Sequence, residues 1–66
     1  MQLEKLTLRQ QRLVREISQA EMAKRIGIHL NTYVKWEKKP KKISVEYAKK
    51  IANVLELDVN DIFFAD

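Results

Sequence analysis

The chain contains one glycine and one proline among its 66 residues, so it has few of the residues that tight β-hairpin turns require. A chain of about this length buries only roughly 60% of the surface that its unfolded form exposes. It has no cysteine, so neither a disulfide nor a cysteine-based metal site can add stability. The sequence therefore predicts a compact all-α bundle, in which amphipathic helices supply the core.

Several classes of protein are disfavoured at this stage. No apolar run reaches the roughly 18 residues that a membrane-spanning helix needs, and no basic-then-apolar leader opens the sequence. The absence of cysteine fits a reducing compartment. We therefore expect a cytoplasmic protein without a membrane partner. We also expect a single domain over residues 1–66, with residues 1–6 as an extended or frayed arm and no room for a separate sensor domain.

The net charge of +4 is unevenly distributed along the sequence. Residues 1–50 hold all 13 Lys and Arg residues against five acids, whereas residues 51–66 hold four acids and no base. The densest basic segment, KWEKKPKK at residues 35–42, has five lysines and one glutamate. Such clustering is typical of proteins that bind a polyanion, although a solvated lysine-rich loop has the same composition.

Capping and turn residues predict five helices. Thr7 precedes the first, and Gln10 follows three residues later, as in a capping box. Further helices are predicted over residues 18–27, from 29 or 30 to 38, over 44–56 and over 58–64, with a loop at 39–43. Their capping and stop residues are Ser18, Gly27, Pro40, Ser44 and Asp58, the last with Asp61 three positions on.

Helical periodicity assigns an inward and an outward side to these segments. The apolar positions expected to face inward are Leu8, Leu13, Ile17, Met22, Ala23, Ile26, Tyr33, Trp36, Val45, Ala48, Ile51, Ala52 and Leu55. In the first helix the polar side would consist of Arg9, Arg12, Arg15 and Glu16. Tyr33 and Trp36 could instead serve as stacking platforms, but their spacing favours the core.

Residues 18–37 form the most specific pattern in the sequence. Two predicted helices of about eight residues each are joined by a short turn at Gly27 and Ile28, and the small Ala23 allows the second helix to cross the first closely. This is the layout of a helix-turn-helix, whose second helix enters the DNA major groove. Its outward residues would be His29, Leu30, Asn31, Thr32 and Lys35.

The segment ISQAEMAKRIGIHLNTYVKWEKK resembles the helix-turn-helix of the phage-repressor/Cro family, also called the xenobiotic-response-element family. The matching residues are Ser18, Gln19, Glu21, Ala23, Gly27, Ile28, Thr32, Trp36 and Glu37. The resemblance extends from Thr7 to about Phe63 and implies a lambda-repressor-like five-helix fold. Glu16 and Lys39 stand where the family usually has glycine, and Leu30 stands where it usually has a polar residue.

The resemblance implies roles for individual residues. Base reading would fall to His29, Leu30, Asn31 and Lys35, and phosphate binding to Gln19, Thr32, Lys38, Lys39, Lys41 and Lys42. Arg12 and Glu37 would form an ion pair between the first and third helices. Asn31 and His29 could instead cap the third helix, Lys35 could hold a phosphate, and Gln19 and Thr32 could be inert surface residues.

These observations indicate a sequence-specific transcriptional regulator of double-stranded DNA, by resemblance a phage- or prophage-type repressor acting by operator occupancy. A homodimer through Phe63 and Phe64 would match a palindromic operator. No catalytic residue, metal, cofactor or small-molecule ligand is expected. One rival is a protein-interaction module, such as an antitoxin or anti-repressor partner, using the acidic, apolar ending VNDIFFAD. A small enzyme is the other, but no nucleophile–base pair or carboxylate pair converges on one helix face.

Overall fold

Five α-helices and one short 3₁₀ helix organise residues 6–63, the part of the chain that the computed structural model describes, the side chain of Phe63 excepted. They are α1 (Leu8–Val14), α2 (Gln19–Ile26), α3 (Leu30–Lys38), η2 (Pro40–Lys42), α4 (Val45–Leu55) and α5 (Val59–Phe63). Within these residues there is no strand, and the predicted all-α fold is confirmed. Residues 1–5 of the expected arm lie outside the described residues.

The helices begin where the sequence places hydrogen-bonding caps. The Thr7 hydroxyl accepts a bond from the backbone N–H of Gln10 at 3.1 Å, and the Gln10 amide oxygen accepts one from the N–H of Thr7 at 2.9 Å. Ser18 and Ser44 cap α2 and α4 in the same way, each accepting from the N–H three residues later. Such bonds satisfy backbone donors that the first helical turn leaves unpaired, and the predicted caps are confirmed.

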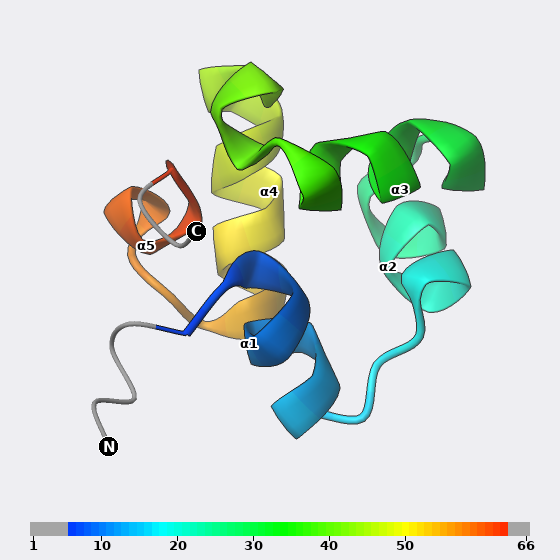
Figure 1. Ribbon diagram of the computed structural model, residues 1–66, viewed down its shortest axis with the longest axis horizontal. Coiled ribbons are helices and arrows are strands. Elements are labelled where there is room, and N and C mark those ends of the chain that lie inside the picture. Colours follow the sequence, from blue (N-terminus) through cyan, green and yellow to red (C-terminus); the bar gives the residue numbers. More distant parts are fainter. Residues whose placement is uncertain (1–5, 64–66) are drawn as a thin grey trace.

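The helix α4 stands in the middle of the molecule, with α5 on one side, α2 and α3 on the other and α1 across its lower end (Figure 1). Its buried stripe of Ala48, Ile51, Ala52 and Leu55 provides one wall of the core. The remaining buried apolar residues are Leu8, Met22, Ala23, Ile26, Tyr33, Ile43 and Ile62. Every α-helix of the described chain therefore contributes to one continuous core.

Three expected orientations are wrong. Leu13 is 45% exposed, because the buried side of the two-turn helix α1 runs through Leu8, Gln11 and Arg12 instead. Arg12, assigned to the polar side, is only 5% exposed. Val45 is 58% exposed, because it is the first residue of α4 and the buried stripe begins one turn later, at Ala48.

The predicted loop at residues 39–43 is also more ordered than expected. Pro40 opens the 3₁₀ helix η2 and is itself buried, and the N–H of Ile43 donates to the Pro40 carbonyl at 3.0 Å. A proline fits the first position of a helix, because its missing N–H would have no partner there. The lysines of this segment are therefore held on a defined turn.

Three residues adopt left-handed backbone conformations at helix ends. Gly27 ends α2 with φ of 77°, as predicted. Glu16 and Glu56 each have φ of 57°, a region in which the Cβ of an ordinary residue is strained. Glu16 occupies the position where the resembling family usually has glycine, so the chain keeps the family's backbone turn with an unfavourable residue.

Replacing Glu16 with glycine should raise the free energy of unfolding by about 0.5–1 kcal/mol. Left-handed geometry costs an L-residue roughly 1–2 kcal/mol, and glycine removes this cost. The greater freedom of glycine in the unfolded chain favours unfolding and cancels only about 0.4–1 kcal/mol of the gain. The measurement is urea unfolding followed by circular dichroism. Glu16→Ala is the control, because it removes the charge but keeps the Cβ. Equal stabilities for the two variants would contradict backbone strain at this position.

Candidate nucleic-acid interface

The turn between α2 and α3 fixes how these two helices cross. The N–H of Gly27 donates to the Lys24 carbonyl at 3.3 Å, and the N–H of Ile28 donates to the Ala23 carbonyl at 3.0 Å. Both bonds satisfy carbonyls at the end of α2 that would otherwise lack partners. Ala23 is 2% exposed, so a small side chain lies where the helices pack. The geometry is that of the predicted helix-turn-helix.

The outer side of α3 presents the predicted base-reading residues to solvent. His29, Leu30, Asn31 and Lys35 are exposed, and Thr32 is half-buried. His29 occupies the N-cap position of α3, but its side chain makes no capping hydrogen bond. The structure therefore brings four of these five side chains into contact with solvent on about two turns of one helix, and it leaves His29 free of the capping role.

A buried polar network lies behind this helix. Arg12 Nε donates to Glu37 Oε2 at 2.6 Å, and Arg12 Nη2 donates to Glu37 Oε1 at 3.2 Å. The side chains of the pair are only 6% and 4% exposed. Arg12 Nη1 also donates to the Ile17 carbonyl at 2.7 Å, and Gln19 Nε2 donates to Glu37 Oε1 at 3.0 Å. Glu37 thus ties α3 to both α1 and α2.

The network also determines which groups are charged. Burial by itself would raise the pKa of Glu37, but the hydrogen bonds from Arg12 and Gln19 and the positive charge of Arg12 lower it below its ordinary value. The hydrogen bond to Glu37 correspondingly raises the pKa of Arg12. Burial raises the pKa of the Tyr33 phenol, and the Glu37 carboxylate beside it adds to the effect. Arg12 and Glu37 are therefore a charged pair and Tyr33 is neutral.

Burial of Glu37 changes the charge that α3 shows to solvent. Between residues 29 and 45 it is the only acid in the sequence. Its carboxylate is turned inward, and the charge of Arg12 compensates its negative charge. The exposed cations of the same segment are Lys35, Lys38, Lys39, Lys41 and Lys42. The surface formed by α3 and η2 is therefore basic without an outward-facing acid.

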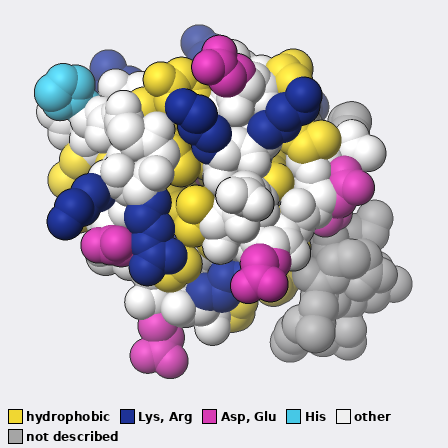
Figure 2. Space-filling model, turned by 180° about the vertical axis from the view of Figure 1, so that it is seen from behind, with side chains coloured by type: hydrophobic (Ala, Val, Ile, Leu, Met, Phe, Trp, Pro, Cys, Tyr) yellow, Lys and Arg dark blue, Asp and Glu magenta, His cyan; other side chains and the backbone are white. Residues whose placement is uncertain are grey.

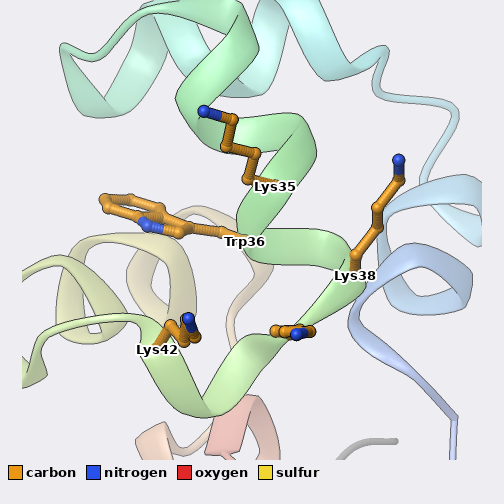
Figure 3. Close-up of a pocket in the computed structure, with 5 residues that line it drawn as sticks. Lys35, Trp36, Lys38 and Lys42 are labelled. Carbon is orange, nitrogen blue, oxygen red and sulfur yellow. The ribbon is translucent and has the colours of Figure 1, made fainter.

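Four of these lysines line an open hollow of about 450 Å³ beside Trp36; they are Lys35, Lys38, Lys39 and Lys42. In Figure 3, Lys35 and Trp36 extend to the same side of α3 and Lys42 lies below the indole ring, whereas Lys38 points to the opposite side of the helix. The ring is half-buried and lies 5.3 Å from that of Tyr47. Trp36 was expected in the core; it is half-buried, packs against the core and also lines this hollow. The signal for its place here is the interleaving of Trp with lysines in KWEKK.

The face of the molecule seen from behind the view of Figure 1 has a mixed charge pattern. Figure 2 shows Lys and Arg side chains mixed there with Asp and Glu side chains and with apolar atoms. One of the mixed-sign pairs in the chain is Arg25 with Glu21, whose Nε and Oε2 atoms are 2.8 Å apart and whose side chains are largely exposed. The segment of α3 and η2 differs from this pair in that its lysines have no exposed acid among them.

Comparison with known proteins agrees with this geometry. The family model described as helix-turn-helix, of the Cro/C1 type, matches residues 8–62. The chain belongs to the Cro/C1-type helix-turn-helix family. It is accordingly a DNA-binding transcription regulator, in a family that is generally non-enzymatic. No match was found among curated proteins or among solved structures.

In this Cro/C1-type helix-turn-helix protein, Gln19 is not an idle surface residue. Its amide group is half-buried and donates to Glu37, which leaves its carbonyl oxygen and one N–H for other partners. No sequence pattern indicated this bond. Phe64 and the side chain of Phe63, expected at a dimer contact, lie outside the described residues. Across residues 6–63, no helix is both long and apolar enough to cross a membrane.

Proposed function

We propose that this chain is a sequence-specific repressor of phage or prophage type, which acts by occupying an operator and excluding polymerase, with residues 1–66 as one DNA-binding domain. The observation that supports this most is the outer side of α3, where exposed side chains able to read bases continue into lysines with no outward-facing acid between them. A major groove about 12 Å wide accepts one such helix.

Base reading is assigned to the first two turns of α3. Asn31 is exposed on the first turn, and an amide side chain can bond adenine N6 and N7 together. Lys35 lies one turn further along, where an ammonium can reach guanine O6 and N7 or a phosphate. His29, without a capping bond, is available as a donor at the helix start. The three side chains together would cover a short run of neighbouring base pairs.

Phosphate binding is assigned to both ends of the helix-turn-helix. Gln19 and Thr32 would hold one strand, because polar side chains near helix N-termini commonly contact phosphates. On the other side, the exposed cations after α3 would hold the backbone as it leaves the groove; these are Lys38, Lys39, Lys41 and Lys42. Such contacts fix the position of the protein without reading sequence.

The variants Asn31→Ala and Lys41→Ala distinguish base recognition from phosphate binding. Asn31→Ala should weaken operator binding by roughly 1–3 kcal/mol and relax preference at one base pair, while non-specific binding changes little. Lys41→Ala should weaken all DNA sequences nearly equally and reduce the salt slope by about one unit per subunit. Fluorescence anisotropy on the selected operator and on scrambled DNA measures both effects.

Circular dichroism controls for the alternative role of Asn31 at the helix start. If Asn31→Ala keeps full operator preference and loses helix, the residue stabilises α3 and does not read a base. If Lys41→Ala changes the preferred sequence, the assignment of η2 to phosphate contacts is wrong.

We also propose a homodimer that binds a palindromic operator. One helix reads about half a helical turn, and a single module of this size buries too little surface for tight specific binding. The acidic charge of residues 51–66 suits a contact held away from phosphates. Sedimentation with and without operator DNA should show two chains per site with half-sites about one turn apart, and a monomer in both conditions would contradict the proposal.

A further inference from the structure

We propose that Leu30 recognises the C5 methyl group of a thymine in the major groove, so that the half-site contains a T·A pair beside the base pair that Asn31 reads. This inference rests on the proposed function, because it requires α3 to lie in the groove. It adds a specificity that neither the family nor the fold supplies. Leu30 stands where the family usually has a polar residue, so the preference belongs to this chain.

The position of Leu30 gives the first part of the argument. It is the first residue of α3, and its side chain is 44% exposed. It is not among the half-buried apolar residues that pack against the core, which include its neighbours Ile28 and Trp36. Leu30 therefore leaves much of an apolar side chain exposed at the start of α3 and does not belong to the core.

The chemistry of the groove gives the second part. Base edges in the major groove present hydrogen-bond donors and acceptors, and the thymine C5 methyl is the only methyl group among them. A leucine against a donor or acceptor would remove that group from water without a new bond, which is unfavourable. A leucine side chain against the thymine methyl instead buries apolar surface on both the protein and the base. Thymine is therefore the base that Leu30 fits.

The other exposed apolar residues show why Leu30 differs from them. Leu13, Val14 and Val45 are also exposed, but the first two lie on α1 and Val45 lies on α4. Leu30 lies between the exposed polar residues His29 and Asn31 at the start of α3, the helix that also carries the exposed Lys35. The single apolar contact is thus placed among hydrogen-bonding side chains, where it distinguishes a methyl-bearing base from cytosine at the same position.

Deoxyuridine tests the inference directly, because it differs from thymine only by the missing methyl. The operator is first selected from random double-stranded DNA with the full chain. Each thymine of the selected site is then replaced by deoxyuridine, one at a time, and Kd is measured. One thymine per half-site should be sensitive, with binding about three- to tenfold weaker, as expected for the loss of one or two buried methyl contacts.

Leu30→Ala should bind the thymine-containing site more weakly than the parent chain by a similar factor. Replacing the sensitive thymine with deoxyuridine should then no longer change the Kd of this variant, whereas the effects of deoxyuridine at other thymines should be unchanged. Val45→Ala, which removes an exposed apolar side chain from α4, should keep the full sensitivity. Circular dichroism confirms that both variants are folded. Since neither residue is in the core, both should have the helix content of the parent.

Two negative results are distinguishable. If the chain selects a preferred sequence but no thymine is sensitive to deoxyuridine, or if Leu30→Ala keeps the same sensitivity, the inference about Leu30 is overturned and the proposed DNA-reading function stands. If random DNA yields no preferred sequence, the proposed sequence-specific function itself fails, and the inference fails with it.

Discussion

Replacing Arg12 with alanine is expected to lower the free energy of unfolding by about 3–5 kcal/mol, the usual cost of leaving one partner of a buried ion pair without the other. The Glu37 side chain, only 4% exposed in the intact protein, would lose its guanidinium partner. A single core in a chain of this size rarely supplies more than about 3–5 kcal/mol in all, so the variant should be largely unfolded. Urea or thermal unfolding followed by circular dichroism measures the loss.

Glu21→Ala is the matched control, because it removes a partner from the other ion pair of the described chain. Arg25 and Glu21 are 2.8 Å apart, close to the 2.6 Å of the buried pair, but their side chains are 48% and 44% exposed. Solvent screens such a pair, and its removal should change the unfolding midpoint little. Comparable losses of stability for Arg12→Ala and Glu21→Ala would show that the burial of the Arg12–Glu37 pair does not determine its contribution to stability.

The buried pair of Arg12 and Glu37 also makes the free energy of unfolding depend on pH, with a sign that follows from the pKa of Glu37. Because the pKa of Glu37 is lowered from its ordinary 4.5 in the folded chain, the unfolded state takes up a proton first as the pH falls. The stability that the pair provides is therefore present above about pH 4.5 and is lost as the pH falls through the folded-state pKa. Glu37→Gln cannot titrate, so this part of the acid dependence should disappear in that variant.

Raising the salt concentration fourfold should weaken DNA binding on the order of 10²-fold per subunit. Each phosphate neutralised by a lysine releases counterions and contributes about −0.9 to the slope of log affinity against log salt, so four contacts give a slope of about −3.6. The four lysines expected to act are exposed and have no outward-facing acid among them; they are Lys38, Lys39, Lys41 and Lys42. Anisotropy over a salt series should show this slope for operator and random DNA alike.

Replacing all four lysines with glutamine should flatten the slope towards zero. Lys49→Gln is the control, because Lys49 is an exposed lysine on α4, outside the basic segment, and it should leave the slope unchanged. A flat salt response of the parent chain would count against phosphate binding by this surface and in favour of the protein-interaction alternative.

Local sequence signals predicted the helix boundaries well. The caps at Thr7, Ser18 and Ser44 and the left-handed Gly27 act on backbone groups within four residues. Such interactions depend only on neighbouring residues, so they can be recognised without knowledge of the tertiary fold. The exposed side of α3 could be predicted for the same reason, since periodicity alone separates the exposed Asn31 from the buried Tyr33.

Tertiary features were harder to predict. Periodicity identifies the apolar side of a helix but not how far the neighbouring helices extend along it, and this is why Leu13 and Val45 were placed inside. It also classed Arg12 as a surface residue, although a guanidinium can be buried once a carboxylate from α3 reaches it. The bond from Gln19 to Glu37 joins residues 18 positions apart, and no local pattern indicates it.

The three-helix junction at Glu37 affects the thermodynamics of binding. Bonds from Arg12 and Gln19 converge on one carboxylate, and hydrogen bonds depend on angle, so they restrain rotation of α3 more strictly than apolar packing does. The helix is therefore preorganised in the free protein, and docking requires little additional ordering of its backbone. Association should behave as a rigid-body encounter, whose rate is set by electrostatic steering and not by a conformational step.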